Sequence, residues 1–310
     1  MLIHILHIIA PVFLVIAAGY LAVKNQLFTD QVVDGLMRFA ILIAVPCLLF
    51  RAIATMDLGT AFDWRLLLAF YGAAALCFTL TALLARRFFK RQPGESVAVG
   101  FTALFSNLVL LGLPISTRAW GEDQIAPLYA LVSLHAPFCY LVGITTMEWL
   151  RSDGRSWPET VGVVVKAMFR NSLMIGIGLG FLVNFSGLAV PKIIGDGIDL
   201  LARAGLPVAL FALGGVLSRY RLSEQLAEAG MVSVVSLLGH PLLVLLFCTL
   251  LGVEPALTAM LVLMAAMPSG LNGYLFANLY QRGQGTAASV VLLATLLSVL
   301  SLSVWLWWLV

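Results

Sequence analysis

Long apolar segments recur along the whole chain, and they limit the folds that it can adopt. Of its 310 residues, 61% are hydrophobic and only 11% are charged, whereas a soluble domain carries about 25% charged residues. A helix needs roughly 20 apolar residues to cross the hydrocarbon core of a bilayer. We therefore predict an all-α integral membrane protein. Polar or turn-rich breaks divide it into ten transmembrane helices at 5–23, 34–54, 65–88, 97–117, 126–150, 161–184, 196–218, 229–251, 255–278 and 286–309.

Lysine and arginine residues predict how these helices are oriented, because cytoplasmic loops carry an excess of both. With the N-terminus outside, thirteen of the 18 basic residues fall on the inner side and five on the outer side. Basic clusters at 86–91 and 151–170 account for most of this bias. We predict a multi-pass inner-membrane protein in a lipid bilayer, with both termini on the non-cytoplasmic side. The net charge of +3 is small and gives no reason to expect nucleic acid binding.

The two halves of the chain share a spaced set of glycine, acidic and proline positions. Five predicted spans per half, an odd number, require the halves to lie in opposite orientations. We predict two inverted five-helix repeats, 1–150 and 161–310, joined by a short cytoplasmic loop at 151–160. Inverted repeats are typical of secondary transporters. Matching positions lie 161 or 162 residues apart: Gly19-Tyr20-Leu21, Asp34-Gly35 and Pro46 match Gly180-Phe181-Leu182, Asp196-Gly197 and Pro207.

The fourth and ninth spans each contain residues that interrupt a helix. Proline removes a backbone donor and glycine weakens the helix further, and in hydrocarbon the freed groups need partners or a water-filled cavity. Paired interruptions at matching positions point to a transporter's binding site, where half-helix N-termini favour an anion. Kinks that serve only packing are the alternative. The candidate substrate-binding residues in these spans are Ser106 and Asn107, with Pro268, Ser269, Gly270 and Asn272.

Other polar residues lie within the predicted spans. His135 precedes Ala136-Pro137 in the fifth span, and an ionisable residue inside a membrane is a functional candidate, although a lone histidine is often structural. The i,i+4 spacings of Asp34 with Arg38 and of Asp199 with Arg203 predict ion pairs along one helix face. No acidic residue lies in the middle of span four or nine. The sequence therefore leaves the coupling ion open.

Several short motifs keep a common order and spacing along nearly the whole chain. They are Phe28-Thr29-Asp30-Gln31, Gly35 with Arg38-Phe39, Val45-Pro46-Cys47-Leu48-Leu49-Phe50, Asn107 with Gly112-Leu113-Pro114, and Ala266-Met267-Pro268-Ser269-Gly270 through Phe276-Ala277 and Tyr280. Together they resemble the auxin efflux carrier family, which includes plant PIN-FORMED proteins and many bacterial relatives.

This resemblance implies a scaffold of spans 1, 2, 6 and 7 and a mobile unit of spans 3–5 and 8–10, which moves like an elevator, often in a homodimer. Asn107 and Pro268 match the residues where spans four and nine cross, and His135 and Tyr140 match positions that face the substrate. Ser106 stands where plant members have proline, which implies a less sharp bend. Bacterial relatives are usually linked to malate, malonate and similar carboxylates, so the family implies a small organic anion, or an auxin-like acid, as substrate.

Other function classes are weighed against a carrier. A membrane-embedded sensor would bind a ligand with the same fold but not transport it. The sequence holds neither an HExxH nor a GxSxG motif, so we expect no enzyme activity. No cofactor or metal site is expected either. A channel would need a selectivity filter, and no filter motif is recognisable.

Overall fold

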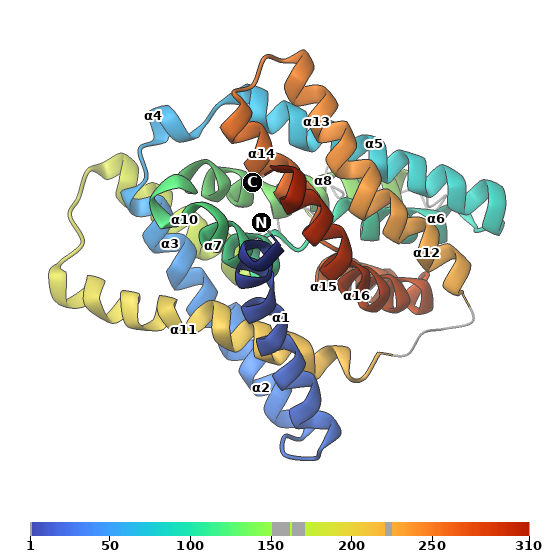
Figure 1. Cartoon of the computed structure of the whole chain (residues 1–310), viewed down its shortest axis with the longest axis horizontal. Coiled ribbons are helices and arrows are strands. Elements are labelled where there is room, and N and C mark those ends of the chain that lie inside the picture. The colour runs from blue at the N-terminus through green and yellow to red at the C-terminus, as the bar shows by residue number, and fades with distance from the viewer. Residues whose placement is uncertain (1, 151–161, 163–170, 221–224, 310) are drawn as a thin grey trace.

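The computed structural model describes residues 2–150, 162, 171–220 and 225–309, and most of these are helical (Figure 1). Within the described residues it contains one isolated backbone bridge and no named strand. The prediction of an all-α fold is confirmed for this part of the chain. The predicted loop at 151–160 and the first turns of the predicted sixth span lie outside the described residues.

Seven helices in the described ranges are long and apolar enough to cross a bilayer. Five are continuous: α1 (Leu2–Lys24), α5 (Trp64–Phe89), α8 (Ala126–Leu150), α11 (Lys192–Leu217) and α16 (Gln284–Leu309). Two are composite: α2 (Asp30–Phe39) continues into α3 (Val45–Thr55), and α12 (Leu226–Val234) into α13 (His240–Leu250). Shorter apolar helices cover Leu108–Trp120, Ser172–Ser186 and Pro255–Ala265, and they overlap predicted spans four, six and nine. The ten-helix inverted repeat stays a prediction.

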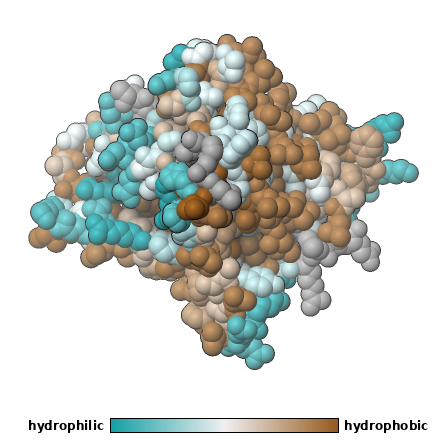
Figure 2. Space-filling view, in the orientation of Figure 1, coloured by the Kyte–Doolittle hydropathy of each residue, from teal (hydrophilic) through white to brown (hydrophobic). Residues whose placement is uncertain are grey.

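Large apolar side chains cover much of the outer surface. Figure 2 shows a broad hydrophobic area over α13 and α16, and hydrophilic residues near the α1–α2 turn. Leu250 on α13 and Leu300 on α16 are 71% and 70% exposed. Continuous apolar surface of this kind marks a membrane-facing side. The distribution therefore agrees with a multi-pass membrane protein.

A π-helical turn precedes each of three prolines inside the apolar helices. These turns are η1 (Ala40–Ala44) before Pro46, η2 (Leu108–Gly112) before Pro114 and η4 (Val235–Gly239) before Pro241. Proline has no N–H, and its ring clashes with the preceding turn. The residue before each proline donates its N–H to the carbonyl five residues back, as Val45 does to Ala40. The wider turn accommodates the ring, so these prolines bulge the helix and do not end it.

Glycines let two pairs of helices approach until their backbones touch. A Cβ atom on Gly19 of α1 would lie 1.9 Å from the carbonyl oxygen of Phe211 in α11. A Cβ atom on Gly180 of α10 (Ser172–Ser186) would lie 2.9 Å from the carbonyl oxygen of Phe50 in α3. Both partners shift by the same 161 residues between the two contacts. Small residues permit such close packing between membrane helices, so α1 pairs with α11 and α10 with α3.

Ion pairs link the two ends of the composite α2–α3 helix to the α11 region. Arg51 Nε lies 3.0 Å from an Asp199 carboxylate oxygen, and Arg219 Nη1 lies 2.8 Å from Asp34. Arg219 also contacts Asp30, at 2.9 Å.

The predicted pairs Asp34–Arg38 and Asp199–Arg203 were therefore wrong. An i,i+4 rule considers neighbours on one helix only, whereas the packing of α11 along α2 and α3 brings a different arginine to each acid.

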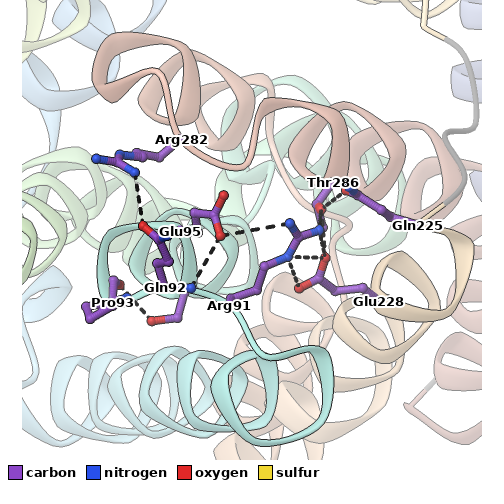
Figure 3. Close-up of polar contacts among 9 residues, drawn as sticks. Arg91, Gln92, Pro93, Glu95, Gln225, Glu228, Arg282 and Thr286 are labelled. Carbon is purple, nitrogen blue, oxygen red and sulfur yellow. Dashed lines mark hydrogen bonds and ion pairs between the residues drawn. The ribbon is translucent and has the colours of Figure 1, made fainter.

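A buried polar cluster joins α12 and α16 to the turn between α5 and α6 (Pro93–Leu104), as Figure 3 shows. Arg91 donates from Nε and Nη2 to the carboxylate of Glu228, at 3.1 and 2.8 Å. Thr286 donates to the same carboxylate at 2.7 Å, and Glu228 is only 1% exposed. The hydrogen bond to Glu228 raises the pKa of the Arg91 guanidinium. Three segments far apart in sequence are thus fastened at one point.

Candidate functional site

Two helices are broken at facing positions, as the sequence predicts. One helix ends with α6 at Leu104 and resumes with η2 and α7 (Leu113–Trp120). The other ends with α14 (Pro255–Ala265) and resumes with α15 (Leu271–Tyr280). Proline and glycine in these stretches disfavour a continuous helix. The breaks therefore follow from local sequence.

The two broken segments are hydrogen-bonded to each other through their backbones. The Asn107 N–H donates to the Pro268 carbonyl, and the Gly270 N–H donates to the Phe105 carbonyl, both at 2.8 Å. Ser106 and Ser269 form the antiparallel bridge between these two bonds. We call residues 105–107 and 268–270 the crossing. Mutual pairing satisfies backbone groups that would otherwise be unpaired in hydrocarbon.

His135 of α8 contacts the crossing directly. Its Nε2 lies 3.1 Å from the carbonyl oxygen of Ser106. A carbonyl oxygen only accepts, so Nε2 carries the hydrogen in this bond. The Phe105 ring packs edge-on against the imidazole at 4.8 Å, and the Cys139 thiol lies 3.8 Å from both ring nitrogens. The predicted site residue His135 is thus brought to the predicted break.

A cavity of about 800 Å³ lies beside the crossing. Its opposite wall is mostly apolar and comes from α2, η1, α3 and α10, with Met37, Ile41, Leu49 and Met174 among its residues. Pro268 and Ser269 do not line the cavity, and Ser269 is only 1% exposed. Six of the eight predicted site residues line it: Ser106, Asn107, His135, Tyr140, Gly270 and Asn272.

Two asparagine side chains give this cavity hydrogen-bond donors. Asn107 makes no side-chain hydrogen bond to any residue in the described ranges. Asn272 accepts at Oδ1 a 3.3 Å hydrogen bond from the Tyr140 hydroxyl. Because its oxygen is used in this way, Asn272 has its NH₂ group left for a ligand. Both amides can therefore donate to an acceptor in the cavity.

Helix N-termini add further donors at the crossing. The first N–H groups of a helix have no partner within that helix, and its dipole places partial positive charge there. η2 begins at Leu108 and α15 at Leu271, and both residues line the cavity. The Leu108 N–H already donates to the Ser106 carbonyl, at 2.9 Å, so the donors of η2 begin with the N–H groups that follow it. These features favour an anion at the crossing.

Several residues at the cavity margin were not among the predicted site residues. Asp34 and Arg219 line it and are paired with each other. The rings of Tyr220 and Tyr274 pack at 5.2 Å between centroids, which joins the segment after α11 to α15. Arg219 contributed only to the charge bias used for orientation, and no motif connects these tyrosines. Their contacts depend on the packing of distant segments.

A second cavity, of about 930 Å³, lies toward the C-terminal ends of α3 and α7. Arg51 and Arg118 are among its lining residues. Leu48 lines this cavity while the next residue, the fully buried Leu49, lines the cavity at the crossing. The two cavities therefore reach α3 at adjacent residues.

Apolar membrane helices around a polar, broken-helix cavity define the class of membrane transport proteins. The family model described as "Membrane transport protein" matches residues 4–306, so the chain belongs to that family. Its members are transporters and not enzymes. The resemblance to auxin efflux carriers is confirmed, because relatives of that name are found.

Three relatives are similar over nearly their full lengths. A "Putative malonate transporter" of Rhizobium meliloti is 25% identical over 298 residues, covering 94% of this chain and 92% of the relative. The "Uncharacterized transporter YfdV" of Escherichia coli K12 is 23% identical, covering 91% and 90%. "Auxin efflux carrier component 5" of Arabidopsis thaliana is 20% identical, covering 95% and 93%.

Proposed function

We propose that this protein is a secondary transporter for a small organic acid anion, a carboxylate such as malonate or malate. The observation that carries the proposal is the cavity at the crossing, where the Asn107 amide and two helix N-termini share one wall. A carboxylate only accepts hydrogen bonds, and this wall supplies donors. The name of the Rhizobium meliloti relative supports the same chemical class.

Neutral donors suit a carrier better than a fixed cation would. A charged side chain at the bilayer centre costs roughly 2.5–3.5 kcal/mol on insertion scales. It would also hold an anion tightly and slow its release. The charged residues that line this cavity among those described, Asp34 and Arg219, are already paired. Amides and helix dipoles can bind the anion and still let it go.

The glycine contacts and the crossing support an inverted repeat. Gly19 packs on Phe211 and Gly180 on Phe50, two contacts that exchange under the 161-residue shift. The two hydrogen bonds at the crossing are likewise reciprocal, because each broken segment donates one bond to the other and accepts one from it. In this arrangement α1, α2–α3, α10 and α11 form the scaffold. The remaining membrane helices form the mobile unit.

The cavity walls support an elevator-type movement. The polar wall belongs to the mobile unit, and the facing wall, which contains Met37, Ile41 and Met174, belongs to the scaffold and is mostly apolar, with the paired Asp34 and Arg219 at its margin. An apolar scaffold face makes few directional bonds, so the mobile unit can slide along it. The second cavity, lined by Leu48, and the cavity at the crossing, lined by Leu49, are the two vestibules between which the site would move. We place the protein in the inner membrane as a homodimer, with both termini outside.

Counterflow separates this proposal from a ligand sensor. Proteoliposomes loaded with unlabelled malonate, malate, succinate or indole-3-acetate are diluted into the labelled compound. A carrier accumulates label transiently against its gradient, whereas protein-free liposomes do not. Binding of a carboxylate by the purified protein without any exchange of label would identify a sensor and contradict transport.

A further inference from the structure

His135 is a titratable side chain placed between the crossing and the cavity. It is 4% exposed and lines the cavity, while Nε2 is committed to the Ser106 carbonyl. The basic lone pair therefore lies on Nδ1. Protonation at Nδ1 would put a positive charge within the site where the anion is expected.

The charges around the cavity do not compensate an incoming anion. Asp30 and Asp34 both contact Arg219, at 2.9 and 2.8 Å. Two carboxylates therefore surround one guanidinium at the margin of the cavity. A helix N-terminus supplies only about half an elementary charge. When a carboxylate moves from water into this site, the described lining residues do not supply a full positive charge to balance it.

The groups that face His135 are not carboxylates. Cys139 and Tyr140 share its helix, and Tyr71 of α5 stacks on it at 6.2 Å between ring centroids. His240 of α13 lies behind the Phe70 ring, which packs against both imidazoles at 6.1 and 4.9 Å. Burying an uncompensated charge is expensive. An imidazolium at this position therefore gains its counter-ion only when an anion enters the cavity.

We propose that His135 takes up a proton together with the substrate anion, so that the proton is the co-transported ion. Water on the open side supplies the proton to Nδ1, and the Nε2–H bond to Ser106 stays in place. The imidazolium offsets one negative charge of the bound carboxylate while the site crosses. Opening to the other side rehydrates the anion, and Nδ1 returns its proton to water there. This inference rests on the proposed transport of a carboxylate.

The test follows proton and substrate in the same proteoliposomes. Labelled malonate, or whichever carboxylate of the counterflow panel exchanges, is added outside, and pyranine inside reports lumenal pH. Wild-type protein should accumulate label when the outside is made acidic and should acidify the lumen as it does so. His135→Gln keeps a donor for the Ser106 carbonyl but has no titratable nitrogen. Whatever label this variant still takes up should enter without lumenal acidification and without a response to the pH gradient.

His240→Gln is the matched control, because His240 is buried in the same unit but does not line the cavity. It should behave as wild type.

Acidification that persists in His135→Gln would overturn the inference and point to entry of the protonated acid. Wild-type uptake that does not respond to the pH gradient would also overturn the inference, but it would leave the proposed transport of a carboxylate intact. This second outcome is measured on the wild-type protein alone, so it does not depend on whether a variant folds. If no carboxylate exchanges at all, the proposed function fails and the inference falls with it.

Discussion

Ser106 and Ser269 pair as an antiparallel bridge between two helices that are both broken at that point. The flanking bonds, from Asn107 to Pro268 and from Gly270 to Phe105, make each segment the partner of the other. The crossing is therefore a shared structure to which both halves of the chain contribute. Its two mutual bonds satisfy an N–H and a carbonyl on each segment, and the Asn107 side chain is left for a ligand.

Replacing Asn107 with alanine should weaken carboxylate binding. A hydrogen bond to a charged group contributes about 1.5–3 kcal/mol, which corresponds to roughly ten- to a hundred-fold in affinity. Titration calorimetry with the carboxylate that exchanges in the panel measures the loss. Asn278→Ala, at an exposed position of α15, is the control and should bind as wild type. Unchanged affinity in folded Asn107→Ala would place the site elsewhere.

The close glycine contacts predict a position-specific loss of stability. Gly19→Ala and Gly180→Ala should each lower the melting temperature, because an added methyl group at a tight contact costs about 1–3 kcal/mol. Gly178→Ala is the matched control on α10, where a Cβ atom would meet nothing within 4 Å. Thermal unfolding in detergent ranks the three. Equal melting temperatures would show that the helices are not packed as described.

Cysteine labelling tests whether the short helices cross the membrane. Single cysteines replace the exposed residues Asn25, Glu254 and Gln281 in a cysteine-free background. With ten spans, the cysteines at 25 and 281 react with an impermeant reagent from the same side, and the one at 254 from the other. Labelling of 254 and 281 from one side would mean that α14 and α15 do not span, and the inverted repeat would be lost.

The buried pair of Arg91 and Glu228 should matter for folding far more than an exposed pair. Breaking a buried ion pair by removing one partner costs about 3–5 kcal/mol, whereas exposed pairs contribute about 0–1 kcal/mol. Glu228→Ala should therefore lower the melting temperature strongly. Asp196→Ala, which breaks the exposed pair with Lys192, should change it little. Similar melting temperatures for both variants would contradict the role given to the cluster.

The sequence predicted the helix breaks at the crossing from local chemistry. The side-chain contacts around the crossing depend on how distant helices pack. Pro268 and Gly270 act on their own helix, so their effect could be read from the sequence. The bond from His135 to the Ser106 carbonyl joins two helices, and only the family resemblance suggested that His135 faces the site. The resemblance likewise placed Tyr140 near the substrate, but its bond to Asn272 had no local signal.

Other features depended on geometry that no pattern in one sequence contains. The acid Asp34 pairs with Arg219 and not with Arg38, because a second helix brings the better partner. The sequence predicted an interruption in the fourth span, which contains Pro114, but not that the turn before this proline is π-helical. The sequence thus indicates where a helix deviates more readily than how it does so.

The crossing also sets an order on membrane insertion. The Phe105 carbonyl and the Asn107 N–H find their partners on Gly270 and Pro268, which are synthesised only after most of the other helices. Unpaired backbone groups are costly in hydrocarbon. The first half of the chain therefore cannot expose its broken helix to lipid while it waits. It has to keep that segment beside water, protein or the insertion machinery until α14 and α15 arrive.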